Sequence, residues 1–461
     1  MSGFAWTDGT VREALGLRAD RATPELAYEA VSTDSRTVAE GGLYVALVGD
    51  RFDGHDFVAD ALARGARGAV VSRPVAGEPS ATLYPVSDTL AALGALAAYR
   101  RKALTVPVVG LTGSAGKTTT KEFIRGALSA AMEVHATPGN LNNRIGLPLT
   151  LLATPADAEV VVLEMGTNEP GEIAALAQVS RPDIGVVVTV GEAHLEKLGS
   201  VEGVLHEKLD LLRHLAEGGR CVVGDEPDFL PPAAREICPG VRVAGWSERA
   251  DQGLRPEGVE VDAWGIHTFR WHGHGVTLGV PGRHAAANAM LALAVSRLLG
   301  VRPKDAARGL SGVEAGSMRV EVRRVGDLTV VVDCYNANPP SVRAALDLLC
   351  QHTASRRVAV LGTMLELGDA STELHRRVLR DALSRDLDLI VATGEFADAA
   401  AMGPGDRRIL AARDWAHAYP ELRSLLAGDE VVLLKASRGV AMEGILSLLE
   451  ADFGATVGEE S

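Results

Sequence analysis

The sequence predicts an α/β protein of three domains, in which helices connect parallel strands. Its 461 residues correspond to about three domains at roughly 150 residues each. Short β-branched runs alternate with Ala/Leu-rich stretches of helical pattern, as in strand–helix–strand units. The apolar runs are nearly continuous, which is typical of strands buried on both faces. We expect domains at residues 1–103, 104–313 and 314–461.

The first two domains are each predicted from a series of strands and helices. Residues 41–74 indicate strand, helix and strand, and a helix follows at 89–102. In the second domain, four apolar runs are expected to be buried strands: 106–112, 158–166, 184–191 and 220–225. Residues 246–280 are polar and alternate weakly, which predicts a small antiparallel patch.

The end of the second domain and the third domain follow from the same patterns. A helix is expected at 285–300, and Pro303 follows its end. Four further strands are expected, each followed by a polar or helical stretch: 328–339, 356–362, 387–395 and 430–437. This alternation predicts a small doubly wound, Rossmann-like domain.

Composition limits the classes of function. The chain has 46 Lys+Arg against 60 Asp+Glu, a net charge of −14, which argues against non-specific nucleic-acid binding. No uncharged apolar stretch of about 18 residues and no signal-peptide pattern is present, so we expect no membrane span. Four cysteines without a CxxC pair indicate a reducing compartment. We expect a soluble, cytoplasmic protein. No feature of the sequence requires an oligomer, so we expect a monomer.

The strongest motif is a glycine-rich phosphate loop at 110–120, GLTGSAGKTTT, between an apolar strand and a helical stretch. Its backbone N–H groups and the helix N-terminus suit a triphosphate. Lys117 would reach the outer phosphates, and the Thr118 hydroxyl would ligate Mg²⁺. Leu111 stands where the usual loop has its first glycine, so this loop is a variant. The predicted ATP-binding residues here are Gly113, Ser114, Ala115, Gly116, Lys117, Thr118 and Thr119.

Three further residues of the second domain are candidates for chemistry. Glu164 ends an apolar strand beside the phosphate loop, where a carboxylate can hold Mg²⁺. His194 follows the next strand, but the residues alone do not favour it over His206 or His214. Lys208 lies beside a buried leucine stripe, and the pattern alone indicates a salt bridge.

Several segments together resemble the Mur ligases of bacterial peptidoglycan synthesis, over nearly the whole chain. The most specific are Tyr-Asn-Ala-Asn-Pro and Lys-Ala-Ser-Arg, and the Asp-Asn-Pro-Arg motif of the ligase that adds the third residue is absent. The matching segments are 32–36, 51–57, 111–122, 139–148, 164–166, 193–196, 282–284, 335–339, 365–368 and 435–438.

The resemblance implies the three-domain Mur ligase architecture, with a central P-loop ATPase domain and a C-terminal Rossmann-like domain. It implies an ATP-dependent ligase that joins D-Ala-D-Ala to UDP-N-acetylmuramoyl-tripeptide through an acyl phosphate. The first domain would hold the UDP end of the substrate. The implied UDP-substrate residues are Ser35, Arg36, Asn142 and Asn143.

The resemblance also assigns roles in the second and third domains. Lys117, His194 and Lys208 would be catalytic, with Lys208 as a carbamate. Two Mg²⁺ ions would be held by Thr118, Glu164, His194 and Lys208. Further contacts to ATP would come from Asn288, Arg319 and Asp333. The acceptor side would be lined by Asn336, Asn338, Lys435, Ser437 and Arg438.

Three positions depart from the family pattern, and two other functions stay open. Ala285 stands for a usual Asn, Thr363 for Asp and Ala436 for Gly, and none removes a group that the chemistry requires. A related ligase that adds glutamate or a diamino acid is one alternative. A P-loop switch or regulatory module without ligation is the other, although the three-domain layout and the Glu/His set argue against it.

Overall fold

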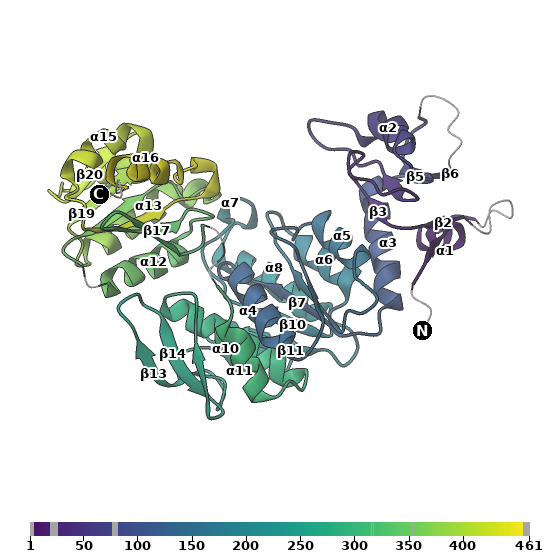
Figure 1. Cartoon of the computed structure of the whole chain (residues 1–461), viewed down its shortest axis with the longest axis horizontal. Helices are drawn as coiled ribbons and strands as arrows, with labels where there is room; N and C mark the ends of the chain where they lie inside the picture. Colours follow the sequence, from purple (N-terminus) through teal and green to yellow (C-terminus); the bar gives the residue numbers. More distant parts are fainter. Residues whose placement is uncertain are drawn as a thin grey trace, which may run out of the picture.

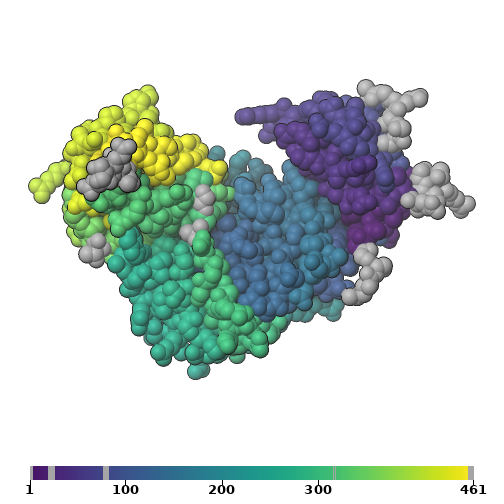
Figure 2. Space-filling model, viewed as in Figure 1, coloured from purple at the N-terminus to yellow at the C-terminus, as the bar shows by residue number. Residues whose placement is uncertain are grey.

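The computed structural model describes residues 4–18, 26–75, 82–314, 316, 318–352 and 354–454. Three units follow one another along the chain, each built on a sheet of mainly parallel strands (Figure 1). The α/β prediction is thereby confirmed. The first and third units stand on either side of the second, and the space-filling view shows a wide opening between them (Figure 2). Among the helices of these residues, none is long and apolar enough to cross a membrane.

The first domain has a four-stranded parallel sheet in the order β3-β4-β5-β6, beside a short antiparallel pair, β1-β2. Asp88 caps the long helix that leads to the second domain, because its side chain accepts the first free N–H groups. The strands are β1 (Trp6–Thr7), β2 (Ala27–Tyr28), β3 (Val31–Ser32), β4 (Leu43–Val45), β5 (Gly68–Val71) and β6 (Thr82–Pro85). The helices are α1 (Asp8–Ala14), η1 (Gly54–Phe57), α2 (Val58–Ala63) and α3 (Thr89–Ala103).

The second domain has a six-stranded, all-parallel sheet in the order β12-β11-β10-β7-β9-β8. The four predicted apolar strands are confirmed as its four central strands. The two edge strands are only three residues long and carry too little pattern to be predicted. The strands are β7 (Val108–Thr112), β8 (Val134–Ala136), β9 (Val160–Glu164), β10 (Ile184–Val187), β11 (Arg220–Gly224) and β12 (Arg242–Ala244).

Helices cover both faces of this sheet, which explains its continuous apolar strands. One face packs against α4 (Lys117–Ser129), α10 (Arg283–Leu298) and α11 (Pro303–Ser311). The other face packs against α5 (Gly146–Leu152), α6 (Glu172–Ser180), α8 (Val201–Arg213) and α9 (Leu230–Ile237). The short α7 (Leu195–Leu198) follows β10. The predicted antiparallel patch is confirmed as β13 (Glu257–Val261), β14 (His267–Trp271) and β15 (His274–Thr277).

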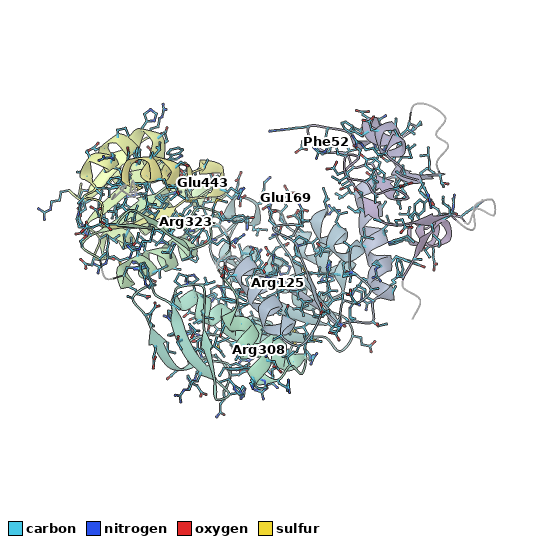
Figure 3. All side chains as sticks on the ribbon, in the orientation of Figure 1. Phe52, Arg125, Glu169, Arg308, Arg323 and Glu443 are labelled. Atoms are coloured by element: carbon cyan, nitrogen blue, oxygen red, sulfur yellow. The ribbon has the colours of Figure 1, made fainter. Side chains whose placement is uncertain are left out.

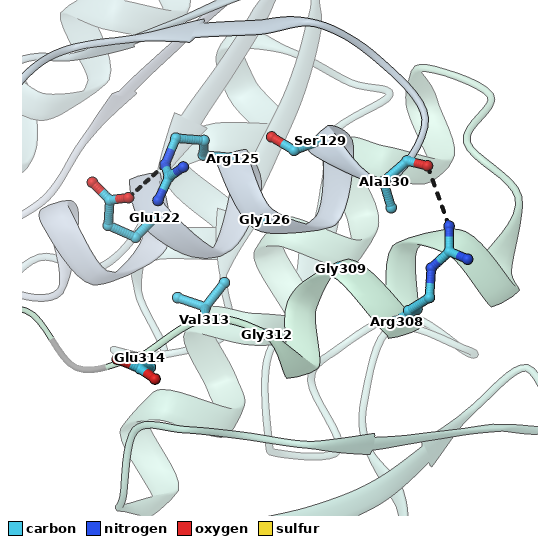
Figure 4. Close-up of a pocket in the computed structure, with 10 residues that line it drawn as sticks. All are labelled: Glu122, Arg125, Gly126, Ser129, Ala130, Arg308, Gly309, Gly312, Val313 and Glu314. Atoms are coloured by element: carbon cyan, nitrogen blue, oxygen red, sulfur yellow. Dashed lines mark hydrogen bonds and ion pairs between the residues drawn. The ribbon is translucent and has the colours of Figure 1, made fainter.

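Two glycines let helices α4 and α11 cross in backbone contact. Gly126 of α4 faces Gly309 of α11 (Figure 4), and a Cβ added at Gly309 would overlap the Gly126 carbonyl oxygen. A hollow of about 560 Å³ lies beside the crossing. Its arginines are already paired, since Arg125 contacts Glu122 at 2.7 Å and Arg308 donates to a helix-end carbonyl at 3.4 Å. We therefore assign no ligand to this hollow.

We expect Gly309→Ala to destabilise the protein by about 1–3 kcal/mol, because a new methyl group must displace backbone. Alanine otherwise favours a helix over glycine, so the sign of the change tests the crossing itself. Thermal unfolding followed by calorimetry measures it. Gly312→Ala is the matched control, since its Cβ would lie 3.6 Å from the Gly309 carbonyl oxygen, an ordinary contact. An unchanged or higher Tm for Gly309→Ala would contradict the prediction.

The third domain has a six-stranded sheet in the order β16-β17-β21-β18-β19-β20, parallel except for the edge strand β16. The four predicted strands are confirmed as β17, β18, β19 and β21. The strands are β16 (Glu321–Val325), β17 (Leu328–Asp333), β18 (Arg357–Leu361), β19 (Leu389–Thr393), β20 (Ile409–Ala412) and β21 (Val431–Lys435). The helices are α12 (Pro339–Gln351), η2 (Gly368–Ala370), α13 (Ser371–Leu383), α14 (Glu395–Ala401), α15 (Trp415–Leu425), η3 (Arg438–Val440) and α16 (Gly444–Phe453).

Candidate active site

A cavity of about 560 Å³ lies between the second and third domains, at the carboxyl ends of β7, β9 and β10. This is the edge at which α/β sheets bind ligands. Most of the predicted site residues meet here. Those that line the cavity are Ser114, Ala115, Gly116, Lys117, Thr118, Thr119, Asn142, Asn143, Glu164, His194, Asn288, Arg319, Asp333, Asn336, Asn338 and Lys435.

The phosphate loop turns from β7 into α4, and Lys117 is the first residue of that helix. Gly116 has φ +75°, and a Cβ there would lie 2.7 Å from Asn288 Nδ2, so two constraints require glycine. Lys117 Nζ donates to the Gly113 carbonyl oxygen at 2.8 Å. Burial lowers the pKa of Lys117, and the Glu164 carboxylate opposes that effect. The loop, the lysine and the helix N-terminus together form an anion site.

Glu164 joins the phosphate loop to a neighbouring loop. Its carboxylate is 1% exposed, and Oε2 accepts a hydrogen bond from Thr118 Oγ1 at 2.9 Å. Oε1 accepts from Asn142 Nδ2 at 2.8 Å. The predicted metal-binding hydroxyl and carboxylate are therefore in contact, and hard oxygen atoms of this kind suit Mg²⁺.

His194 is held at the boundary between the two domains. Its Nδ1 lies 2.7 Å from Glu366 Oε2 of the third domain. Burial lowers the pKa of His194, and the hydrogen bond to Glu366 opposes this shift. The same contact lowers the pKa of Glu366. His206 and His214 do not line the cavity. The structure thus separates His194 from the two histidines that the sequence alone could not exclude.

Lys208 is fully buried in α8, and its Nζ has no hydrogen-bond partner in the structure. Burial and the neighbouring Lys117 lower the pKa of Lys208 far below its usual range. Glu207 accepts instead from the Gly171 and Ile173 N–H groups, at 2.7 and 2.8 Å. The prediction of a salt bridge for Lys208 is therefore wrong, because the adjacent Glu207 carboxylate binds the backbone at the start of α6.

Two predicted acceptor residues hold a loop of their own domain. Lys435 Nζ lies 2.8 Å from Asp333 Oδ2 and donates to the Asn336 carbonyl oxygen at 2.5 Å. Ser437 Oγ donates to the Ala337 carbonyl oxygen at 3.3 Å. Both side chains fix the segment after β17, from which Asn336 is exposed toward the cavity.

Two arginines lie close to the aromatic ring of Tyr335 near this loop. The Arg319 guanidinium lies 3.6 Å from the centre of the Tyr335 ring, and that of Arg438 lies 5.4 Å from it. Cation–π attraction of this kind orients a guanidinium without neutralising its charge. Both cations are therefore available to an anionic substrate.

Other predicted residues lie outside the cavity lining. Ser35 is buried in the first domain, and the Arg36 side chain is 82% exposed and contacts Asp34 at 2.7 Å. The loop that carries Phe52 projects from the same domain toward the opening (Figure 3). Lys208 is likewise beyond the lining. The remaining predicted residues outside it are Gly113, Ser437 and Arg438.

Several residues of the lining were not assigned a role from the sequence, among them Asp225, His284 and Tyr335. Asp225 directly follows β11, so the rule that singled out Glu164 would have found it. His284 and Tyr335 lie in segments that carry the family resemblance. Their place in these segments is the sequence signal that could have marked them as site residues. Burial lowers the pKa of His284.

The described residues contain no cluster of three or more His, Cys, Asp or Glu side chains arranged to hold a metal ion. The hydroxyl of Thr118 and the carboxylate of Glu164 fit one Mg²⁺ ion, as oxygen donors in mutual contact. A second ion would need another anionic oxygen. The buried, unpartnered amine of Lys208 supplies one only after chemical modification.

The fold and the site define a P-loop nucleotide-binding enzyme whose cavity is completed by a second α/β domain. Three family models match the chain: "Mur ligase family, catalytic domain" at residues 27–101, "Mur ligase middle domain" at 111–296, and "Mur ligase, glutamate ligase domain" at 318–438. The chain belongs to the Mur ligase family, and the enzyme is a ligase.

Relatives and solved structures agree with this membership. The chain is 36% identical to the UDP-N-acetylmuramoyl-tripeptide–D-alanyl-D-alanine ligase of Bacillus subtilis, over 90% of this chain and 92% of the relative. MurF from Acinetobacter baumannii has a TM-score of 0.90 and 32% identity, and the match covers 98% of this chain and all of that one. The MurF ligase of Thermotoga maritima in complex with ADP has a TM-score of 0.80 and 29% identity, covering 92% and 97%.

Proposed function

We propose that this enzyme uses ATP to join D-Ala-D-Ala to UDP-N-acetylmuramoyl-tripeptide in peptidoglycan precursor synthesis. One observation carries the proposal: the phosphate loop and the Tyr335–Pro339 segment border the same cavity. ATP and an acceptor can therefore meet within one site. The relatives that match nearly the whole chain are named for this reaction.

The proposed reaction needs no nucleophilic side chain. The terminal carboxylate of the tripeptide attacks the γ-phosphate of ATP, which gives an acyl phosphate and ADP. The amine of D-Ala-D-Ala then attacks the acyl carbon, phosphate leaves, and the amine loses a proton. Lys117 neutralises charge that develops on the phosphates, which lowers the barrier of the first step. Asn288 would contact adenine, and Arg319 and Asp333 would contact the γ-phosphate and ribose.

We propose two Mg²⁺ sites, held by Thr118, Glu164, His194 and a carbamylated Lys208. Bound Mg²⁺ supplies Lewis-acid stabilisation of the phosphates. The low pKa of Lys208 supports the modification, because only a neutral amine adds CO₂. The addition forms an N–C bond and releases one proton, and it converts the neutral amine into an anionic oxygen ligand.

The remaining assignments complete the proposal. Ser35 and Arg36 of the first domain, with Asn142 and Asn143 of the second, would bind the UDP-linked substrate. The acceptor would be bound by Asn336, Asn338, Lys435, Ser437 and Arg438, in part through the loop that they hold. The proposal places the enzyme in the cytoplasm, because both substrates and ATP are water-soluble. It also takes the enzyme to act as a monomer.

An acceptor screen with phosphate release as the readout tests the function. We expect phosphate release only when UDP-N-acetylmuramoyl-tripeptide and D-Ala-D-Ala are both present, with diaminopimelate or lysine as the third residue. Release with a single amino acid and a shorter UDP-substrate, but not with D-Ala-D-Ala, would indicate a related ligase. Nucleotide binding without ADP formation in every combination would indicate a P-loop switch.

A further inference from the structure

Asn338 is the residue whose side chain connects the third domain to the phosphate loop. Its Nδ2 donates to the Ser114 carbonyl oxygen at 3.1 Å, across 224 positions of the chain. Its Oδ1 accepts from the Ser341 N–H at 3.0 Å, which caps the start of α12. The side chain is 5% exposed. One amide therefore serves two domains, its oxygen within its own domain and its nitrogen across the boundary.

The carbonyl that Asn338 contacts belongs to a tightly fixed part of the phosphate loop. Ser114 Oγ donates to the Gly191 carbonyl oxygen at 3.2 Å and accepts from the Gly191 N–H at 3.0 Å. The Ser114 N–H donates to the Thr189 carbonyl oxygen at 2.9 Å. The direction of the Ser114 carbonyl is thus set by the conformation of the loop that would surround the phosphates.

The start of α12 also packs closely at this point. A Cβ added at Gly191 would lie 2.8 Å from Pro340 Cγ, so the absence of a side chain permits the approach. Two other contacts across the boundary are charged and partly exposed. Glu192 pairs with Arg343 and Arg377, whose side chains are each 42% exposed. Solvent screens such pairs. The strength of the buried hydrogen bond from the Asn338 amide depends instead on its direction and distance.

We propose that Asn338 is a positioning residue that couples the conformation of the phosphate loop to closure of the third domain. The bond forms only when Ser114 presents its carbonyl in the observed direction, so a ligand that fixes the loop favours the observed arrangement of the second and third domains, which we term closed. By linkage, closure then strengthens nucleotide binding by the same factor. This role differs from the direct acceptor contact that the family resemblance implied for Asn338, and it rests on the proposed function only in its kinetic consequence.

Asn338→Asp is the variant that separates the two halves of this role. Aspartate caps a helix as well as asparagine, so α12 and the thermal stability should be retained. It cannot donate to the Ser114 carbonyl, and it places a carboxylate oxygen against it. Ser341→Ala is the matched control, because it weakens the same cap and leaves the bond between the domains intact.

Fluorescence transfer between labels in the second and third domains, with Mg²⁺ and a non-hydrolysable ATP analogue, measures closure. We expect the analogue to close the wild type and Ser341→Ala. In Asn338→Asp, we expect the closure constant and the affinity for the analogue to fall about tenfold. In the ligase assay, kcat should fall for Asn338→Asp with little change in the KM for D-Ala-D-Ala.

Three results would overturn the proposal. If Asn338→Asp closes on the analogue as the wild type does, Asn338 does not couple the phosphate loop to domain closure. Equal losses of Tm and closure in both variants would reduce Asn338 to a helix cap. A change confined to the KM for D-Ala-D-Ala would make it an acceptor-binding residue. Failure of the proposed function is distinguishable, since the wild type would then close on the analogue but release no phosphate with D-Ala-D-Ala.

Discussion

Alanine in place of Lys208 is expected to reduce turnover by about 10³-fold or more while leaving nucleotide binding in place. The amine is fully buried and unpartnered, and burial together with the neighbouring Lys117 lowers its pKa well below the usual range. A lowered pKa increases the neutral fraction of the amine at any given pH, and that fraction rises further as the pH rises. Because only the neutral form adds CO₂, the variant would lose the proposed carbamate and with it the proposed anionic metal ligand.

Three measurements test this expectation. Turnover is measured by phosphate release and nucleotide binding by calorimetry. Lys197→Ala is the control, because Lys197 is a nearby lysine, 56% exposed and 3.5 Å from Glu169. Formate or acetate should partly restore Lys208→Ala, and removal of CO₂ should slow the wild type. Full activity in Lys208→Ala without added carboxylate would end the carbamate proposal.

Glu164→Gln is expected to lower kcat by about 10²–10³-fold and to raise the Mg²⁺ concentration for half-maximal rate. Glutamine keeps the shape of the side chain and removes the charge that faces Thr118 Oγ1 at 2.9 Å. It also brings an amide group toward Asn142, whose Nδ2 now donates to Oε1 at 2.8 Å. Glutamine keeps one acceptor oxygen, which can serve Thr118 or Asn142 but not both, so the metal site and the adjoining loop no longer share an acceptor.

Initial rates over a Mg²⁺ titration at saturating ATP give both parameters. Glu159→Gln is the matched control, because Glu159 is exposed and precedes the same strand at its opposite end. We expect the control to keep the wild-type Mg²⁺ dependence. An unchanged kcat and an unchanged titration in Glu164→Gln would exclude Glu164 from the metal site.

The elements of this fold were predictable where several residues repeat one pattern. The strands β7, β9, β10 and β11 are continuous apolar runs, and each was found. The three-residue edge strands β8 and β12 were not, because so short a segment has no measurable period. Parallel pairing followed from the alternation with helices, which cross over between neighbouring strands.

The site was predictable where local spacing carries the chemistry. The phosphate loop and the strand-end position of Glu164 needed only their neighbours in the sequence. Lys208 was misinterpreted from its helical pattern, because the burial that changes its pKa comes from elements distant in the sequence. The bond between Asn338 and Ser114 spans 224 positions, and no local pattern encodes it.

The backbone contact between α4 and α11 also determines where the molecule can bend. Because Gly126 and Gly309 have no side chains, the backbones of the two helices are in direct contact. This contact holds α11 against α4, the helix that begins at the phosphate loop. The chain that leaves α11 is fixed again at Glu314, which bridges to Gly279 beside β15. We therefore expect a pivot for the third domain to lie beyond Glu314, past the last of these backbone contacts.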